Sequence, residues 1–232
     1  MTASTTHLPL QRFVFPGSAV GTKFTDTIEI DQEAHVLYAG DNWTGGMDVF
    51  DIATPEPKFV RTIKMRNTFY GISVAKNVNK VFVGLRSSAV AVIDGDPGSP
   101  KFHTVIAEID TGGRGSADLI DYDPTDKKLY AANRNDGFMT AIDAVSNTVV
   151  KRIEGLGGGL EQPRYNPTDG MVYLCGNSDD VLYQVDAKTD TLMNTFPIGD
   201  VCRPNGLAIN PKSNMALLAC NNRERPHTVI GT

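Results

Sequence analysis

The sequence predicts an all-β fold, a β-propeller of four-stranded antiparallel blades, and two observations support this prediction. The first is a repeat of about 45 residues along most of the 232-residue chain, a period typical of propeller blades. The second is that each repeat consists of short apolar, β-branched runs separated by Gly, Asn, Asp and Pro, without a convincing amphipathic helix. Radial repetition of similar sheets would place equivalent residues around one axis.

An aromatic residue or a leucine closes the second apolar run of each repeat and serves as its anchor. The anchors lie 43 to 48 residues apart, at Tyr38, Phe82, Tyr130, Tyr173 and Leu217. The five units extend over about residues 24–65, 69–110, 116–153, 160–198 and 203–232. Because the repeat is uninterrupted, residues 1–232 are expected to form a single domain.

The third unit illustrates how each strand is predicted. A short apolar run at Leu119-Ile120 leads to a turn at Asp123-Pro124, where Pro fixes φ and the Asp side chain bonds its own backbone. A second run ends at the anchor Tyr130, a third ends in Asp143, and Val149–Ile153 forms the edge strand. The β-branched content of these runs favours strands over helices.

The fifth unit has three predicted strands, the last at 227–230. A candidate fourth strand lies at the other end of the chain, where residues 11–17 resemble the segment Met193–Gly199. Two architectures therefore remain open. One is a closed five-bladed ring in which the N-terminal strand completes the last blade and removes exposed sheet edges. The other is the first five blades of a longer propeller.

Composition narrows the range of partners. The net charge is −5 and 21% of the residues are charged, with no large Lys/Arg cluster, so nucleic acid is not expected as a partner. No apolar stretch is long enough for a membrane span. The glycine-rich segment 155–159 lacks a following Lys-Ser/Thr, so neither a nucleotide nor a flavin is expected. The start of the chain has no signal-peptide pattern, which predicts a cytoplasmic protein, or an exported one if a leader has been removed.

The three cysteines are Cys175, Cys202 and Cys220. Their number is odd and no C-x-x-C motif occurs, which favours reduced thiols in or near strands. A Cys175–Cys220 disulfide is the alternative, because both residues closely follow their anchors in neighbouring units.

Polar residues recur twelve positions before the anchors, at the opening of the strand that lines a propeller's central channel. They are Asp26, Tyr70, Asp118, Glu161 and Asn205. Neighbouring carboxylates raise one another's pKa unless a cation neutralises them, and oxygen ligands suit hard divalent cations. Asp26, Asp118, Glu161 and Asn205 are therefore candidate ligands of one divalent cation, Ca²⁺, Mg²⁺ or Zn²⁺. The alternative is a solvated channel that binds no metal.

A second polar set follows the anchors and is expected near the same mouth, where Arg side chains could bind a carboxylate or a substrate oxyanion. With Tyr70 and the arginines at the strand openings, the candidate ligand-binding residues are Tyr70, Arg86, Asn133, Arg134, Arg164, Asn177, Arg203 and Asn221.

Two segments resemble the repeat of a known propeller family. Ile142–Val150, and Phe196–Gly199 followed by Pro204–Pro211, look like the YVTN repeat of the YncE-like propellers. This resemblance extends over about residues 25–230. It implies a propeller fold, although such propellers usually have seven blades, about two more than are found here.

Shorter motifs resemble the gluconolactonase (SMP-30) family. Glu161-Gln162-Pro163 is similar to its E-x-P strand opening, and Pro204-Asn205-Gly206 to its P-N-G opening. In that family such Glu and Asn residues ligate an axial divalent metal. Here the two motifs lie in adjacent units, closer together than in the family.

Two functions thus remain open. The first is a binding propeller that presents its mouth to a small molecule or a protein. The second is a metal-dependent hydrolase of the lactonase or esterase type, in which Glu161 and Asp118 are the catalytic carboxylates and the bound metal polarises a carbonyl or acidifies a water molecule.

Overall fold

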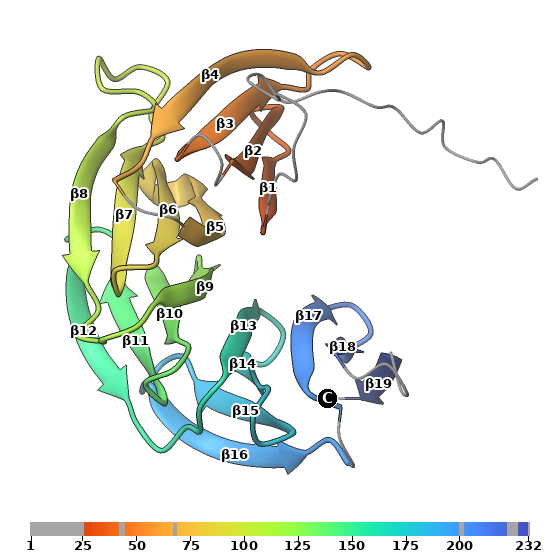
Figure 1. Ribbon diagram of the computed structural model, residues 1–232. Coiled ribbons are helices and arrows are strands. Elements are labelled where there is room, and N and C mark those ends of the chain that lie inside the picture. Colours follow the sequence, from red (N-terminus) through yellow and green to blue (C-terminus); the bar gives the residue numbers. More distant parts are fainter. Residues whose placement is uncertain (1–25, 42–44, 67–68, 200–201, 222–226, 232) are drawn as a thin grey trace, which may run out of the picture.

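The computed structural model describes residues 26–41, 45–66, 69–199, 202–221 and 227–231, which form five antiparallel sheets arranged around an arc (Figure 1). Four sheets have four strands and the fifth has three. The all-β propeller prediction is therefore confirmed. In the described part of the chain, no helix combines the length and the apolar character needed to cross a membrane.

The strands of the first three sheets follow the chain order. They are β1 (Ile28–Asp31), β2 (Val36–Asp41), β3 (Gly46–Asp51), β4 (Lys58–Lys64), β5 (Phe69–Ala75), β6 (Lys80–Leu85), β7 (Ala89–Asp94), β8 (Val105–Asp110), β9 (Ala117–Asp123), β10 (Lys128–Asn133), β11 (Phe138–Asp143) and β12 (Thr148–Ile153). A short 3₁₀ helix, η1 (Lys76–Val78), connects β5 and β6.

The last two sheets have the same strand order. Their strands are β13 (Leu160–Asn166), β14 (Met171–Gly176), β15 (Val181–Asp186), β16 (Thr191–Pro197), β17 (Pro204–Asn210), β18 (Met215–Cys220) and β19 (His227–Gly231). The candidate strand at residues 11–17 lies outside the described residues.

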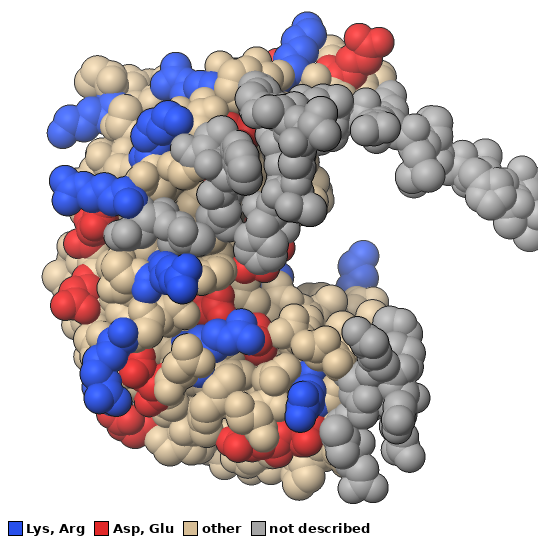
Figure 2. All heavy atoms as spheres, in the orientation of Figure 1, with Lys and Arg blue, Asp and Glu red and all other residues tan. Residues whose placement is uncertain are grey.

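Each sheet places its first strand innermost, and the four-stranded sheets place their fourth strand outermost (Figure 1). The described residues leave the arc open between β1 and β17, so they do not form the closed five-bladed ring (Figures 1 and 2). Figure 2 shows Lys and Arg side chains interspersed with Asp and Glu on this face, without a large area of one sign.

The core lies between neighbouring sheets, because alternate side chains of a strand point to opposite faces. In β10, Leu129 and Ala131 pack against the second sheet. Tyr130 and Ala132, from the same strand, pack against the fourth sheet. A middle strand of a blade is therefore buried on both faces, which explains its nearly continuous apolar sequence.

The anchor tyrosines also bond to the next blade. The hydroxyl of Tyr130 donates to Oδ1 of Asp190 at 2.7 Å, and Nζ of Lys128 lies 2.8 Å from the other carboxylate oxygen of Asp190. In the first blade, the hydroxyl of Tyr38 is 3.1 Å from Nε2 of His103 in the second blade. The repeated aromatic residue thus ties each of these sheets to its successor.

We expect Tyr130→Phe to lower the free energy of unfolding by about 1 to 2 kcal/mol, because a buried carboxylate loses a donor while the packed ring is kept. Urea unfolding measures this change. Tyr165→Phe is a suitable control, since its hydroxyl bonds the exposed Thr125. Equal effects of the two variants would contradict a stabilising role of the buried Tyr130–Asp190 hydrogen bond.

The four complete blades each carry a β-bulge in the outermost strand. In β4, for example, Phe59 pairs with Phe50 and Arg61 pairs with Val49, which leaves Val60 unpaired. The bulged residues are Val60, Ile106, Val150 and Met193, all of them exposed. A bulge interrupts regular pairing at a free edge and so disfavours edge-to-edge association.

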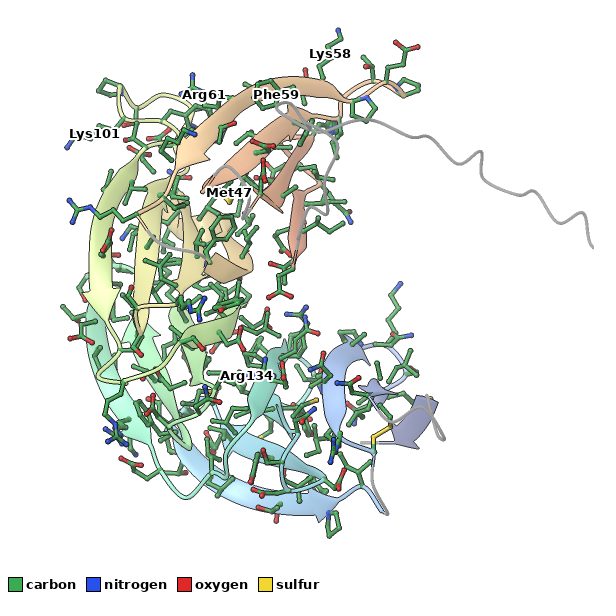
Figure 3. The ribbon with its side chains drawn as sticks, viewed as in Figure 1. Met47, Lys58, Phe59, Arg61, Lys101 and Arg134 are labelled. Carbon is green, nitrogen blue, oxygen red and sulfur yellow. A yellow bond between two sulfur atoms is a disulfide. The ribbon has the colours of Figure 1, made fainter. Side chains whose placement is uncertain are left out.

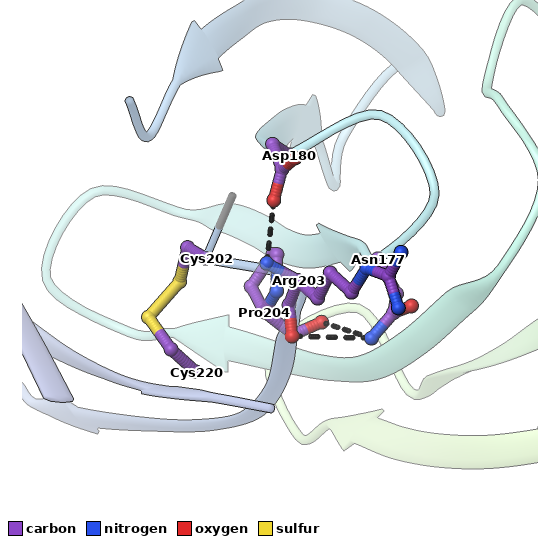
Figure 4. Close-up of a disulfide and its surroundings, with 6 residues drawn as sticks. All are labelled: Asn177, Asp180, Cys202, Arg203, Pro204 and Cys220. Atoms are coloured by element: carbon purple, nitrogen blue, oxygen red, sulfur yellow. Dashed lines mark hydrogen bonds between the residues drawn. A yellow bond between two sulfur atoms is a disulfide. The ribbon is translucent and has the colours of Figure 1, made fainter. Parts of the chain in front are cut away.

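The cysteines differ from both sequence-based expectations. Cys202 and Cys220 form a disulfide (Figure 4) with a Cα–Cα distance of 4.7 Å. Cys175 is free and buried. Antiparallel pairing of β17 with β18 places the residues before β17 beside the end of β18. Cys175 cannot reach Cys220 because it packs in the core between the fourth and fifth sheets. The prediction of three reduced thiols, and the alternative Cys175–Cys220 bond, are therefore wrong.

Candidate functional site

The inner strands bring the polar residues that precede the anchors to one mouth of the arc. Tyr70, Asp118, Glu161 and Asn205 are each the second residue of their inner strand. Asp26 lies just before β1. Successive inner strands contact each other, so the equivalent positions come together as the repeat predicts.

Arg134 lies between the carboxylates of two neighbouring blades (Figure 3). Its Nη1 is 2.8 Å from Oδ2 of Asp118, and its Nη2 is 2.6 Å from Oε1 of Glu161. The Asp118 and Glu161 side chains are only 3% and 2% exposed. Two nearly buried carboxylates therefore share one guanidinium, whose planar fork matches this geometry.

The backbone of Arg134 is held on both sides. Its N–H donates to the carbonyl of Ser116 at 3.3 Å, and its carbonyl accepts from the N–H of Leu160 at 3.0 Å. These bonds link the inner strands of the third and fourth blades. The guanidinium is thus positioned by main-chain bonds as well as by its ion pairs.

Asn205 and Asp26 belong to the same cluster. The Asn205 side chain hydrogen-bonds to Glu161. Burial raises the pKa of Asp26, the charge of Asp118 raises it further, and Arg134 lowers it. The four predicted metal ligands are therefore brought together, with Arg134 among them.

The cluster contains three carboxylates, Asp26, Asp118 and Glu161, and one arginine. The pKa of each of these carboxylates is raised. Burial raises the pKa of Glu161 to about 7; the charges of Asp118 and Asp26 add to this, while Arg134 opposes it. Burial also raises the pKa of Asp118 against the effect of Arg134. For Arg134, burial acts to lower the pKa, but the surrounding carboxylates more than offset this and raise it.

The arrangement does not fit a divalent cation. Among the described residues, no group of three or more His, Cys, Asp or Glu side chains is arranged to hold a metal ion. The neutralising charge that the carboxylates require comes from Arg134. Asp26, Asp118, Glu161 and Asn205 as a metal site therefore remain a prediction from the sequence alone.

A pocket of about 440 Å³ opens beside this cluster, between the second and third blades. Its lining includes Tyr70, Arg86, Arg114, Ser116, Asp118 and Arg134. Both predicted sets thus contribute to one mouth, Tyr70 and Asp118 from the strand openings and Arg86 and Arg134 from the positions after the anchors.

The backbones of the second and third blades approach each other closely at Gly84. A Cβ atom at Gly84 would lie 2.5 Å from the carbonyl oxygens of Ala117 and Asp118. Only glycine fits there, and its absence of a side chain lets β6 lie directly against β9. Arg86 follows β6 by one residue, and it lines the pocket together with Asp118.

Asn133 is not available to a ligand, contrary to the expectation from its position after an anchor. It is fully buried. Its amide donates to Oγ1 of Thr140 at 2.9 Å, and its Oδ1 lies 2.6 Å from the hydroxyl of Thr111. The hydroxyl of Thr111 also lies 2.7 Å from the carbonyl of Ser88. Asn133 therefore joins the second and third blades beneath Arg134.

Arg164 lies in a second tier of the channel, three residues further along its strand than Glu161. Its Nη1 is 3.2 Å from Oδ1 of Asp121. Burial raises the pKa of Glu29 to about 7, with Asp121 adding to the rise and Arg164 opposing it. Arg164 is thus a structural counter-ion for Asp121 and is not among the residues that line the mouth pocket.

The remaining candidates lie where the fourth and fifth blades meet. The Asn177 side chain donates to the carbonyl of Arg203 at 3.1 Å (Figure 4). Within the fifth blade, the N–H of Asn221 donates to the same carbonyl at 3.1 Å. The Arg203 N–H donates to Asp180. These three residues are not among those lining the pocket.

Several residues of the channel were not predicted. Arg114, Ser116 and Asn135 line the pocket, and Glu29 and Asp121 form the second tier. Strand alternation did not predict the second tier, because side chains three residues apart lie on opposite faces of a regular strand. The pairing of β9 with β10 is shifted between Ala117 and Ile120, which the sequence pattern does not reveal. Arg114 lies in an irregular connection, where the repeat carries no positional information.

The raised pKa of Glu161 predicts a pH dependence of stability. A carboxyl group whose pKa is higher in the folded state stabilises fully below its ordinary value of 4.5, and this contribution is lost as the pH rises through about 7. We expect Glu161→Gln to gain stability relative to the wild type over this interval, by on the order of 1 kcal/mol after solvent screening.

Urea unfolding of the wild type and of Glu161→Gln, at pH values between 4.5 and about 7, measures this difference. Burial lowers the pKa of His103 to about 4, which acts in the opposite sense. That contribution is common to both proteins and cancels in the difference. A difference that stayed constant with pH would show that Glu161 does not titrate as described.

Comparison with protein-family models gave no match, and no curated protein matched either. Solved structures are similar in fold. A chain of Kuenenia stuttgartiensis hydrazine synthase has a TM-score of 0.72 at 15% identity, over 90% of this chain and 59% of that chain. A chain of the mitotic checkpoint complex has a TM-score of 0.76 at 15% identity, over 90% of this chain and 61% of that chain.

The chain thus spans about three fifths of the length of these structural neighbours. Both neighbours are propellers, and at this level of identity the similarity concerns the fold alone. The protein is a β-propeller whose inner strands carry a charged mouth.

Proposed function

We propose that this protein is a binding propeller that takes a small molecule in the mouth pocket between its second and third blades. The observation that supports this most directly is the pocket itself, which has a volume of about 440 Å³ and carries three arginines. Ligand sites are typically concave, of a few hundred Å³, with a few converging polar groups.

The pocket rests on an ordered base, as a preformed binding site requires. Asn133, which precedes Arg134 in the chain, forms a buried hydrogen-bonded network with Thr111 and Thr140. Arg134 is held by its ion pairs and its backbone bonds. A ligand would therefore meet side chains that are already positioned.

The metal-dependent hydrolase is the weaker candidate. It needs a divalent cation among Asp118, Glu161 and their neighbours, where Arg134 supplies the positive charge. A protein partner at the mouth is the other alternative. One of the structural neighbours is a chain of a protein assembly, the mitotic checkpoint complex. The YncE-like assignment stays a proposal supported by the repeat motifs alone.

Ligand-observed NMR with a library of small metabolites tests the proposal. Asn135→Trp should block the exposed rim of the pocket and abolish binding. Ser178→Trp is the matched control, because Ser178 is the exposed residue at the equivalent position of the fourth blade. Binding that survives Asn135→Trp, or a library without any binder, would contradict a small-molecule site in this pocket.

A further inference from the structure

We infer that the ligand carries a carboxylate, which binds Arg86 in place of a carboxylate that the second blade lacks. This inference rests on the proposed function and assigns a chemical class to the ligand. It follows from comparing two equivalent arginines of the repeat.

Arg86 and Arg134 occupy the same position in consecutive blades, four residues after the anchors Phe82 and Tyr130. In the third blade, Arg134 binds two carboxylates at the openings of inner strands. One is Asp118 of its own blade, and the other is Glu161 of the next blade. The position is thus built to place a guanidinium between two strand-opening side chains.

In the second blade neither strand-opening position supplies Arg86 with an ion pair. The strand-opening residue of its own blade is Tyr70, which has no carboxylate. The strand-opening residue of the next blade is Asp118, whose Oδ2 already lies 2.8 Å from Nη1 of Arg134. No described residue forms an ion pair with Arg86, which is exposed at the pocket.

A second guanidinium stands at the same rim. The Arg114 side chain is 95% exposed, and its ion pair with Asp136 is made through Nε at 3.6 Å. The loop that carries it is fixed, because the N–H groups of Arg114 and Gly115 donate to Oδ2 of Asp136 at 2.9 and 3.1 Å. A Cβ atom at Gly113 would lie within 3 Å of three polar side-chain atoms, so the loop has little room to rearrange.

The pocket is therefore positively charged at its rim, while its base carries an acceptor. Arg86 and Arg114 present cationic groups at the rim, whereas Asp118 at the base is an acceptor already paired with Arg134. A carboxylate binds a guanidinium through two parallel hydrogen bonds, and a hydroxyl group would donate to the base. The combination fits a hydroxylated organic acid of metabolite size.

The chain as a whole has a net charge of −5. General attraction of anions by the protein is therefore not expected, and any affinity for anions must come from this local arrangement.

Isothermal titration of the full chain at low ionic strength tests this assignment. The probes are D-gluconate and citrate, with D-glucose as the neutral polyol and inorganic phosphate as a non-carboxylate anion. We expect a carboxylate to bind, and Arg86→Gln to weaken that binding by about tenfold or more. Arg66→Gln is the control, since the Arg66 side chain is 85% exposed and lies outside the pocket.

Tyr70→Asp tests the reasoning from the repeat directly. It gives the second blade the carboxylate that the third blade has in Asp118, so Arg86 becomes paired internally. We expect this variant to lose carboxylate binding even though Arg86 is intact. Its melting temperature shows whether it is folded, and Arg86→Gln supplies the same test at an exposed position if it is not.

The outcomes separate the two proposals. Equal binding of D-glucose and D-gluconate, unchanged by Arg86→Gln, would overturn the anionic class and leave the small-molecule site in place. Binding of phosphate alone, without the carboxylates, would also overturn the carboxylate assignment. No binding by any probe, together with no binder in the metabolite library, would overturn the proposed function as well.

Discussion

Replacing both Cys202 and Cys220 with serine lowers the free energy of unfolding by about 3 kcal/mol, the value expected for a crosslink that closes a loop of this size. The two cysteines are 18 residues apart in the chain. The loss should be large because the fifth sheet has only three described strands and packs on the fourth sheet through one core cluster. Urea unfolding of the oxidised protein and the double variant measures the difference.

A reducing agent provides the control. It should lower the stability of the wild type to that of the double variant and leave the variant unchanged. Equal stability of the oxidised wild type and the double variant would contradict the structural role of the bond. Disulfides are typical of oxidising compartments, so the exported alternative becomes the localisation to test.

Arg134→Gln should lower the free energy of unfolding by about 2 to 3 kcal/mol. It leaves the nearly buried carboxylates of Asp118 and Glu161 without their counter-ion, and breaking a buried pair from one side is costly. We place the effect below that of a fully buried pair because the Arg134 side chain is 40% exposed.

The double variant Arg134→Gln/Glu161→Gln should recover much of this loss, since it removes one of the unpaired charges. Arg66→Gln is the surface control, because the Arg66 side chain is 85% exposed and lies 3.9 Å from Glu108, and it should have little effect. If Arg134→Gln and Arg66→Gln were equally mild, Arg134 would not be the counter-ion of the cluster.

Much of the fold could be predicted because it follows from the repeat. The anchors and the residues twelve positions before them specify which strand is innermost, and Tyr70, Asp118, Glu161 and Asn205 indeed share one position in their strands. Period and strand alternation are enough to determine such equivalences.

The pairing within the mouth could not be predicted in the same way. Asn133 ends β10 and is buried, whereas Arg134 follows the strand and reaches the carboxylates of the mouth. Arg134 neutralises the carboxylates because its side chain extends from the third blade to Glu161 of the fourth blade. The sequence pattern does not show how far a side chain extends. Likewise, the Cys202–Cys220 bond depends on the register of β17 and β18, in which Pro204 pairs with Cys220.

Thermal unfolding with Ca²⁺, Mg²⁺ or Zn²⁺, compared with a chelator, tests most directly the claim that Arg134 is the cation of the carboxylate cluster. A ligand that binds only the folded state raises the melting temperature. With Arg134 between Asp118 and Glu161, we predict a change below about 1 °C for each metal. A metal-dependent rise of several degrees that Glu161→Gln abolishes would contradict the account and favour the metal site.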